Sequence, residues 1–221
     1  MMRHFFLLIL AISIPILLFA QNPKSKNTTR SEYKDGRYFH TYSTCVVNAP
    51  FKKTEAVINE VFNGLKSTPT KSLRWAFDGL GKAKTQDDNV QLYEKSVSYD
   101  PKTSAYIVTL LMIMDDNDEM ELRIEGELKN VCYNTGRREL CLNVTKKVKV
   151  LNDGIISISA IPREDNTTVL ILHSKLKFGF LIDMFFTQTR YKDIIEWRLA
   201  EFLNNMKIRA EKENSMAKSN K

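Results

Sequence analysis

The feature that most constrains this chain is the alternation of apolar and polar side chains along three stretches of its second half. The stretches cover residues 119–128, 140–150 and 170–180, and in each of them apolar residues mostly alternate with polar or charged ones. This period of two is typical of strands that bury one side and expose the other. Turn sequences such as Asn152-Asp153-Gly154 separate the runs. Because short connections join antiparallel neighbours, the pattern predicts an antiparallel meander.

Two helices flank this meander in the sequence. A strand rich in aromatic and β-branched residues, Tyr38–Val47, ends at Asn48-Ala49-Pro50, and proline suits the start of the helix that is predicted to run to Leu65. After six predicted strands, apolar side chains recur every three or four residues over 181–209, which predicts one long helix. Residues 66–88 show no regular spacing of apolar residues from which a helix or strand could be predicted. The chain is therefore expected to be an α+β protein with about seven strands.

This order of elements resembles the helix-grip superfamily, which contains the START, polyketide-cyclase and pollen-allergen proteins and is often named SRPBCC. The resemblance covers about Thr41 to Met206. Two segments carry it: Val46-Val47-Asn48-Ala49-Pro50 before the first helix, and the passage from strand to helix between Leu170 and Leu203. It implies a curved antiparallel sheet packed on a long C-terminal helix. It also implies a cavity between the two that holds a lipid, a sterol, a polyketide or another apolar ligand.

The resemblance places the lining of this cavity on the inward side of the strands and on the inner stripe of the last helix. The residues expected to contact the ligand are Leu122, Ile124, Leu142, Val144, Leu172, Ser174, Leu176, Met184, Gln188, Tyr191 and Ile195. Ser174 and Gln188 are polar members of this set, and they either orient the ligand or bond to nearby groups of the protein. A packed core needs the same alternation, so a filled interior remains the alternative.

The N-terminus has the composition of an export signal. Arg3 precedes an apolar run from Phe5 to Ala20, and the chain then turns polar. These features are typical of a cleaved signal peptide, and an uncleaved anchor is the alternative. Residues 1–20 are therefore expected to be a signal peptide, 21–37 a flexible polar spacer, 38–209 a single helix-grip domain and 210–221 a disordered polar tail. We expect an exported protein, periplasmic or extracellular.

The motifs of several enzyme classes are absent from the sequence. It has no nucleophile elbow, no HExxH motif, no dinucleotide fingerprint and no P-loop. The 3 histidines are isolated from one another, so no metal site is expected, and no cofactor is expected either. The readable strands carry no inward acid or base. The leading hypothesis is a non-enzymatic binding or carrier protein for an apolar molecule or lipid, with a cyclase-type enzyme as an alternative.

Export would permit a disulfide, and Cys132 and Cys141 flank a turn around Gly136. A two-residue loop would place the two cysteines opposite each other on neighbouring strands. Strict alternation places them on opposite faces instead, unless a bulge at Lys129-Asn130 shifts the register. A Cys132–Cys141 bridge therefore stays one of two alternatives, and Cys45 is expected to be free and buried.

The positive charge and one strand that is apolar on both faces indicate which partners the protein could have. The formal net charge is +7, and Lys175 and Lys177 are expected on the outer face, where they either meet anionic lipid or are solvated. Residues 105–114 are apolar on both faces of their strand, so a partner subunit, a membrane surface or another part of this chain is expected to cover the outer face. Peripheral membrane contact and a homodimer thus stay open. An envelope-associated interaction module with a filled core is the second hypothesis. No nucleic-acid partner is expected for an exported protein.

Overall fold

The computed structural model of this chain describes residues 27–66, 73–81, 91–113, 119–134, 136–146, 151–180, 183 and 187–219. The predicted signal peptide and Met184 lie outside the described residues. Within them, no helix is both long enough and apolar enough to cross a membrane.

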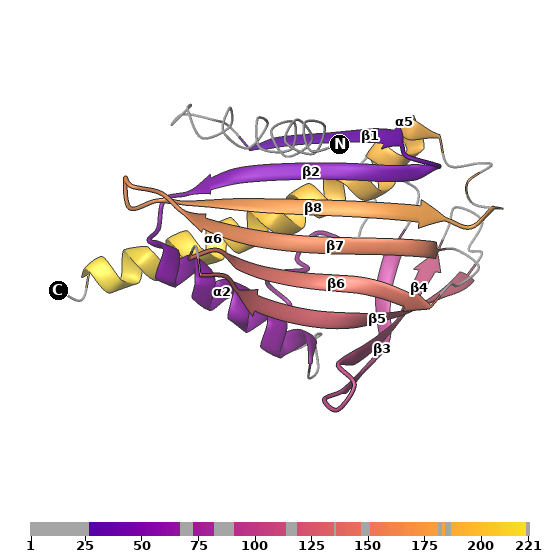
Figure 1. The fold of residues 1–221 in the computed structure, drawn as a ribbon, viewed down its shortest axis with the longest axis horizontal. Helices are drawn as coiled ribbons and strands as arrows, with labels where there is room; N and C mark the ends of the chain where they lie inside the picture. The colour runs from indigo at the N-terminus through magenta and orange to yellow at the C-terminus, as the bar shows by residue number, and fades with distance from the viewer. Residues whose placement is uncertain are drawn as a thin grey trace, which may run out of the picture.

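Eight strands form one antiparallel sheet in the order β1-β2-β8-β7-β6-β5-β4-β3, one strand more than predicted (Figure 1). The strands are β1 (Thr28–Lys34), β2 (Tyr38–Val47), β3 (Gln91–Asp100), β4 (Ala105–Ile113), β5 (Glu119–Cys132), β6 (Arg138–Lys146), β7 (Leu151–Pro162) and β8 (Thr168–Phe178). The helical elements are α2 (Phe51–Leu65), α5 (Gln188–Tyr191), the π-helical turn η1 (Lys192–Glu196) and α6 (Trp197–Ser219). The predicted helix-grip architecture, a curved antiparallel sheet with a long C-terminal helix, is confirmed.

The additional strand, β1, comes from the segment that was predicted to be a flexible spacer. It pairs with β2 through a hairpin whose turn residues Asp35, Gly36 and Arg37 all have positive φ angles. Hydroxyl groups join the two strands: Thr29 meets Ser43 at 2.8 Å and Ser31 meets Thr41 at 2.9 Å. Because this strand pairs through polar side chains, hydropathy gave no signal for it. The spacer prediction is therefore wrong for residues 28–34.

The C-terminal helix also differs from its prediction at both ends. Phe180 and Asp183 are helical, and the Asp183 amide donates to the Gly179 carbonyl at 2.8 Å, but the helix is interrupted at Thr187. Thr187 caps α5, and its hydroxyl accepts a hydrogen bond from the Arg190 amide at 3.2 Å. At the other end, α6 continues to Ser219, so most of the predicted disordered tail is helical. Ala210, the first residue of that tail, is fully buried in the core. A small apolar side chain on the buried stripe thus extends the packed part of the helix.

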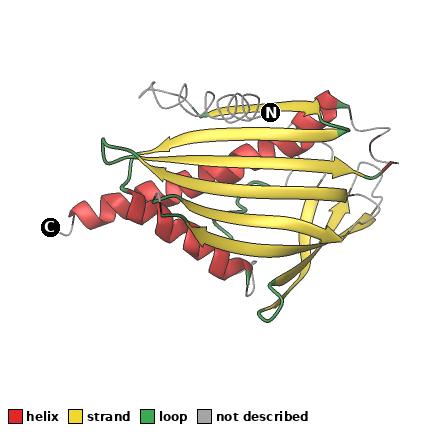
Figure 2. Cartoon of the chain, viewed as in Figure 1, coloured by secondary structure: helices red, strands yellow, loops and turns green. Residues whose placement is uncertain are grey.

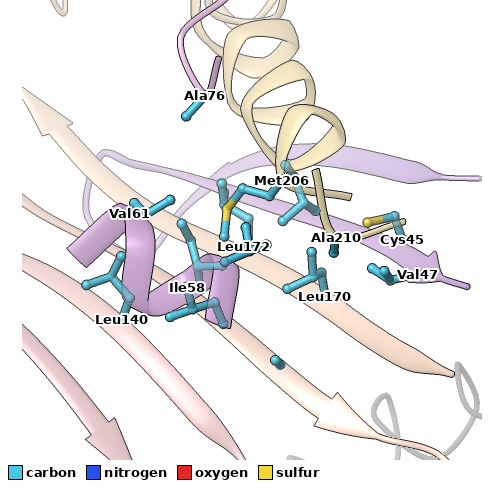
Figure 3. Close-up of a cluster of buried hydrophobic side chains, with 14 of the residues drawn as sticks. Cys45, Val47, Ile58, Val61, Ala76, Leu140, Leu170, Leu172, Met206 and Ala210 are labelled. Carbon is cyan, nitrogen blue, oxygen red and sulfur yellow. The ribbon is translucent and has the colours of Figure 1, made fainter. Parts of the chain in front are cut away.

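The described helices lie together on one face of the sheet, and none of them covers the other face (Figure 2). Between α2, α6 and the sheet lies the larger hydrophobic cluster, which includes Ile58 and Val61 from α2, Leu170 and Leu172 from β8, and Met206 from α6 (Figure 3). α6 packs mainly on β2 and β8, and α2 packs on β6 and β7. This arrangement decides which part of the inner face is sealed.

The strand pairing shifts register at three places in the described sheet: the shift at Glu94/Ser96 lies between β3 and β4, and the other two lie beside glycines. One lies at Glu125/Gly126, where a Cβ atom on Gly126 would come within 2.7 Å of the Asn143 carbonyl oxygen. The other lies at Leu151/Asp153, next to Gly154, so the predicted turn at 152–154 is an irregularity inside β7 rather than a chain reversal. A bulge increases local twist and bends its strand, which gives the sheet its concave inner face.

The cysteines do not pair. Cys132 lies opposite Arg138, and Cys141 lies opposite Lys129. The two cysteines are three positions apart along this ladder, about 10 Å, whereas the Cα atoms of a disulfide lie within roughly 7 Å. All three cysteines are free thiols, Cys45 is buried as predicted, and the bridge prediction is wrong. The bulge that would have aligned the pair occurs earlier in β5, at Glu125/Gly126.

Candidate functional site

The inner face of the sheet is sealed at one end by a compact aromatic cluster. Phe39, Leu176 and Phe178 surround Tyr191, which is fully buried. The Tyr191 ring stacks on Phe39 with a centroid distance of 4.3 Å and an interplanar angle of 10°. Tyr191 and Leu176, both expected to contact a ligand, are therefore packed against neighbouring side chains of the protein.

Buried hydroxyl groups fasten the helix to the sheet at this point. Thr41 and Ser174 are opposite each other on β2 and β8, and both are fully buried. The Tyr191 hydroxyl shares a hydrogen bond of 2.6 Å with Thr41 Oγ1. Burial raises the pKa of Tyr191, and the hydroxyls of Thr41 and Ser174 partly oppose that rise. Ser174 thus lies beside this helix–sheet anchor, although its buried Oγ has no hydrogen-bond partner in geometric terms among the described residues.

The centre of the inner face is less deeply buried than the aromatic cluster. Six apolar side chains of adjacent strands, which we call the apolar strip, are only half-buried. They are Leu110 of β4, Leu122 and Ile124 of β5, Leu142 and Val144 of β6, and Ile156 of β7. The register brings them together, since Leu110 pairs with Leu122 and Leu142 pairs with Ile156. Leu142 packs against the larger hydrophobic cluster, and Ile124, Val144 and Ile156 pack against the aromatic cluster. Neighbouring inner positions such as Leu128, Leu140 and Leu172 are buried, so the partly accessible part of this face is apolar.

The positions of the helices explain why the strip is half-buried. α6 crosses behind β2 and β8 and leaves the inner side of β4 and β5 to one side of its path (Figure 1). Two half-buried helical residues, Ile195 of η1 and Leu199 of α6, pack against the clusters that border the strip. The strip therefore has sheet residues on one side and an apolar helical edge on the other.

A buried arginine holds this part of the helix in place. The Arg198 guanidinium donates to the Ile194 carbonyl within the helix, and its Nε donates to the Leu80 carbonyl at 2.9 Å. Arg198 is 6% exposed and its guanidinium lies 4.6 Å from the Trp197 ring centroid. The π-helical turn directly precedes it, and such turns often mark functional sites because they shift the side chains that follow.

The structure separates the predicted ligand contacts into groups. Five lie on or beside the apolar strip: Leu122, Ile124, Leu142, Val144 and Ile195. Four are buried in packed clusters or in the anchor: Leu172, Ser174, Leu176 and Tyr191. Gln188 is exposed and donates from Nε2 to the Ser31 carbonyl at 3.3 Å, so β1 takes the contact that was expected for a ligand. Met184 is outside the described residues.

Outer-face histidines form a pair rather than a metal site. His173 lies 6.0 Å from His40 and 4.4 Å from Tyr42 between ring centroids. Burial lowers the pKa of both histidines, and His40 is 5% exposed. Among the described residues, no group of three or more potential metal ligands is gathered at one place.

Sequence reasoning missed one further feature, a cavity of about 300 Å³ between β1, β2 and α6. Its lining includes Thr29 from β1 and Ser43 from β2, together with Ala200, Glu201 and Asn204 from α6. The cavity depends on β1, and a segment interpreted as a spacer could not suggest it. The Thr and Ser alternation in residues 28–31 and 41–44 is the one sequence signal that pointed to this pairing.

Comparison with known proteins bears on the fold. No family model and no curated protein sequence matches this chain. A conserved protein from Geobacillus kaustophilus aligns with a TM-score of 0.50 at 10% identity, over 79% of this chain and 96% of that one. The Zhui aromatase/cyclase from Streptomyces sp. R1128 aligns at 0.47 with 14% identity, over 80% and 96%. The human StarD13 lipid transfer and protein localization domain aligns at 0.44 with 10% identity, over 88% and 96%. At such identities a structural likeness concerns the fold alone.

Proposed function

We propose that this protein binds a hydrophobic small molecule or lipid on the apolar strip and acts as a non-enzymatic binding or carrier protein. One observation carries the proposal: the aliphatic side chains of the apolar strip are only partly buried, while inner positions around them, such as Leu128, Leu140 and Leu172, are buried. Covering apolar surface releases about 25 cal/mol per Å², so an apolar ligand placed there is favoured. Ligand sites of this kind are lined mainly by hydrocarbon side chains.

The chemistry of the strip favours binding over catalysis. Its six side chains are all aliphatic, so none of them can donate or accept a proton. The structure places one acid beside the strip, contrary to the expectation from the sequence: Glu94 of β3 lies opposite Leu110 and is half-buried, so a cyclase-type reaction would have to use it or another residue outside the strip. The proposal is therefore a carrier, and product formation from a bound polyketide-like substrate would contradict it.

An interaction module is the second candidate, and the outer face of β4 supports it. Ile107, Leu111 and Ile113 lie on that face and are half-buried, while Glu119, Glu121 and Glu125 of β5 stand opposite them. A second copy of the chain or another protein would be needed to cover this apolar row. A homodimer or a membrane contact belongs to this candidate.

Export remains part of the proposal. The apolar run of residues 5–20 supports a signal peptide and a periplasmic or extracellular location. N-terminal sequencing of the protein from the secreted or periplasmic fraction would test it. A chain that begins near residue 21 is the expected result, and an intact N-terminus in the cytoplasm would contradict it.

The carrier proposal is tested by purifying the chain without detergent from a host that makes lipids. Native mass spectrometry and solvent extraction would then show whether an apolar molecule is bound at near one per chain. The Leu122→Gln variant, on the strip, is expected to lose most of that load. Leu111→Gln, a matched change on the outer face of β4, should keep it.

Two outcomes would overturn the carrier proposal. One is an unliganded mass in the wild type together with no thermal stabilisation by a panel of lipids and sterols. The other is equal loading of the Leu122→Gln and Leu111→Gln variants. A dimeric mass that Leu111→Gln converts to a monomer would favour the interaction module instead.

A further inference from the structure

We infer that the cavity between β1, β2 and α6 is a second binding site, for a small organic ammonium ion. It lies apart from the apolar strip, because Ile195 and Leu199 pack toward the clusters beside the strip while Ala200 and Asn204 line this cavity. The cavity volume of about 300 Å³ is at the lower end of the range for small-molecule sites. A ligand the size of one substituted ring fits that volume.

The sheet side of the cavity is built from a hydroxyl pair above an apolar floor. Thr29 and Ser43 lie 2.8 Å apart across the β1–β2 pair, and Ser43 is 2% exposed. Cys45, the next inward residue of β2, is buried, and burial raises the pKa of its thiol to about 12. The thiol is therefore neutral and serves as a small apolar contact rather than a nucleophile. Leu203 of α6 completes this floor.

Amide groups close the rim. The Asn27 side chain donates to the Asn204 side-chain oxygen at 3.3 Å across the gap between the start of β1 and α6. Both amides line the cavity. Each amide has a carbonyl oxygen with two lone pairs, so the rim can accept further hydrogen bonds from a bound donor.

The charge of the lining decides the ligand class. Glu201 lines the cavity, and among the described residues it has neither an ion-pair partner nor a hydrogen-bond partner. Its carboxylate is the one charged group among the described residues that line the cavity. Near Cys45, the positive charge of Lys207 is accompanied by the negative charge of Glu211.

An ammonium group matches this combination better than an anion or a neutral alcohol does. It carries the charge that a carboxylate needs and donates up to three hydrogen bonds to hydroxyl, amide and carboxylate oxygens. An anion would face the carboxylate of Glu201 and be repelled. A neutral alcohol would satisfy some of the hydrogen bonds but leave the carboxylate unpaired.

Isothermal titration calorimetry with three isosteric probes tests the inference on the intact mature chain at pH 7. Benzylamine is expected to bind, benzyl alcohol to bind at least tenfold more weakly, and benzoate not to bind. Glu201→Gln should weaken benzylamine binding about tenfold, since a charged hydrogen-bonded pair is lost. Glu119→Gln, the same change on the exposed outer side of β5, is the matched control and should leave binding unchanged.

Ala200→Leu provides a second variant that fills the cavity without altering its charge, and it should abolish benzylamine binding. Equal affinity for benzylamine and benzyl alcohol would overturn the ammonium assignment. Unchanged binding in both Glu201→Gln and Ala200→Leu would overturn the site itself. Because the lipid load is measured separately through Leu122→Gln, failure here is distinguishable from failure of the carrier proposal.

Discussion

Tyr191 is the residue that links the C-terminal helical segment to the sheet. Its ring completes the aromatic cluster, and its hydroxyl bonds to Thr41 in the sheet. A buried hydroxyl that loses its partner costs about 1–3 kcal/mol, whereas a hydrogen bond at the surface contributes much less. Because Thr41 also bonds to Ser31, the geometry predicts the loss of one buried hydrogen bond when the Tyr191 oxygen is removed.

Tyr191→Phe is expected to lower the free energy of unfolding by about 1 kcal/mol, since one buried hydrogen bond is lost while the Thr41 hydroxyl keeps its bond to Ser31. Urea denaturation followed by circular dichroism would measure the change. Tyr33→Phe is the matched control, because the Tyr33 hydroxyl reaches Asp183 at an exposed position. If both variants have the stability of the wild type, the anchor has no energetic role.

The His40–His173 pair predicts how stability depends on pH. Burial lowers the pKa of each ring, and for His173 the positive charge of His40 lowers it further. Lys34 and Lys175 also lower both pKa values. Asp35 and Glu32 raise that of His40, and Glu139 raises that of His173. The balance favours neutral rings in the folded protein.

Because the folded rings bind protons less readily than the unfolded ones, stability is fully present above the unfolded histidine pKa of about 6.5 and is lost as the pH falls below it. Urea midpoints measured between pH 7.5 and 5 should decrease toward acid. The double variant His40→Gln/His173→Gln should flatten that dependence. An unchanged slope in the double variant would show that other groups titrate.

At the scale of the elements, the shape of the sheet depends on its bulges. Gly126 occupies the bulge of β5, where a Cβ atom would lie 2.7 Å from a backbone oxygen of Asn143. At Gly154 the nearest atom is Leu176 Cδ2 at 3.0 Å, which belongs to a side chain and can move. A methyl group at Gly126 would require the backbone to move, whereas one at Gly154 would require only a side chain to move.

Gly126→Ala is expected to destabilise the protein by about 1–3 kcal/mol, because the backbone of β6 must shift to admit a methyl group. Gly154→Ala, the control, should cost less. Thermal unfolding would compare the two variants. A smaller loss for Gly126→Ala than for Gly154→Ala would mean that the bulge is not tightly fitted.

The C-terminal helix illustrates the same dependence on context. Its apolar stripe is visible in the sequence, but the π-helical turn at Lys192–Glu196 is not. This turn arises where Tyr191 is fixed to the sheet and Arg198 is fixed to the Leu80 carbonyl. Two distant attachments thus set the register of one helix.

At the scale of the whole molecule, the fold leaves two different surfaces beside one helix. The apolar strip lies on the concave side of β4 to β7, and the polar cavity lies between β1, β2 and α6. A helix that packs mainly on β2 and β8 cannot cover the full width of an eight-stranded sheet. Both proposed binding sites follow from that mismatch.

The sequence by itself determined the strands that alternate, the helix after Pro50 and the long final helix. These features depend on side chains a few residues apart, and their periods of two and 3.6 are local properties. The α+β class and the helix-grip arrangement follow from their order. Five of the predicted ligand contacts, including Leu122 and Leu142, lie at the strip for the same reason.

Only the tertiary structure decided the eighth strand, the cysteine register and the place where the inner face stays open. β1 pairs with β2 through hydroxyl groups, which give no hydrophobic pattern in the sequence. The loop length and the position of the bulge in β5 set the strand register that keeps Cys132 and Cys141 apart. Whether Tyr191 is sealed and Leu122 half-exposed depends on where α6 crosses the sheet. Contacts between residues distant in sequence set that position, and no local pattern records them.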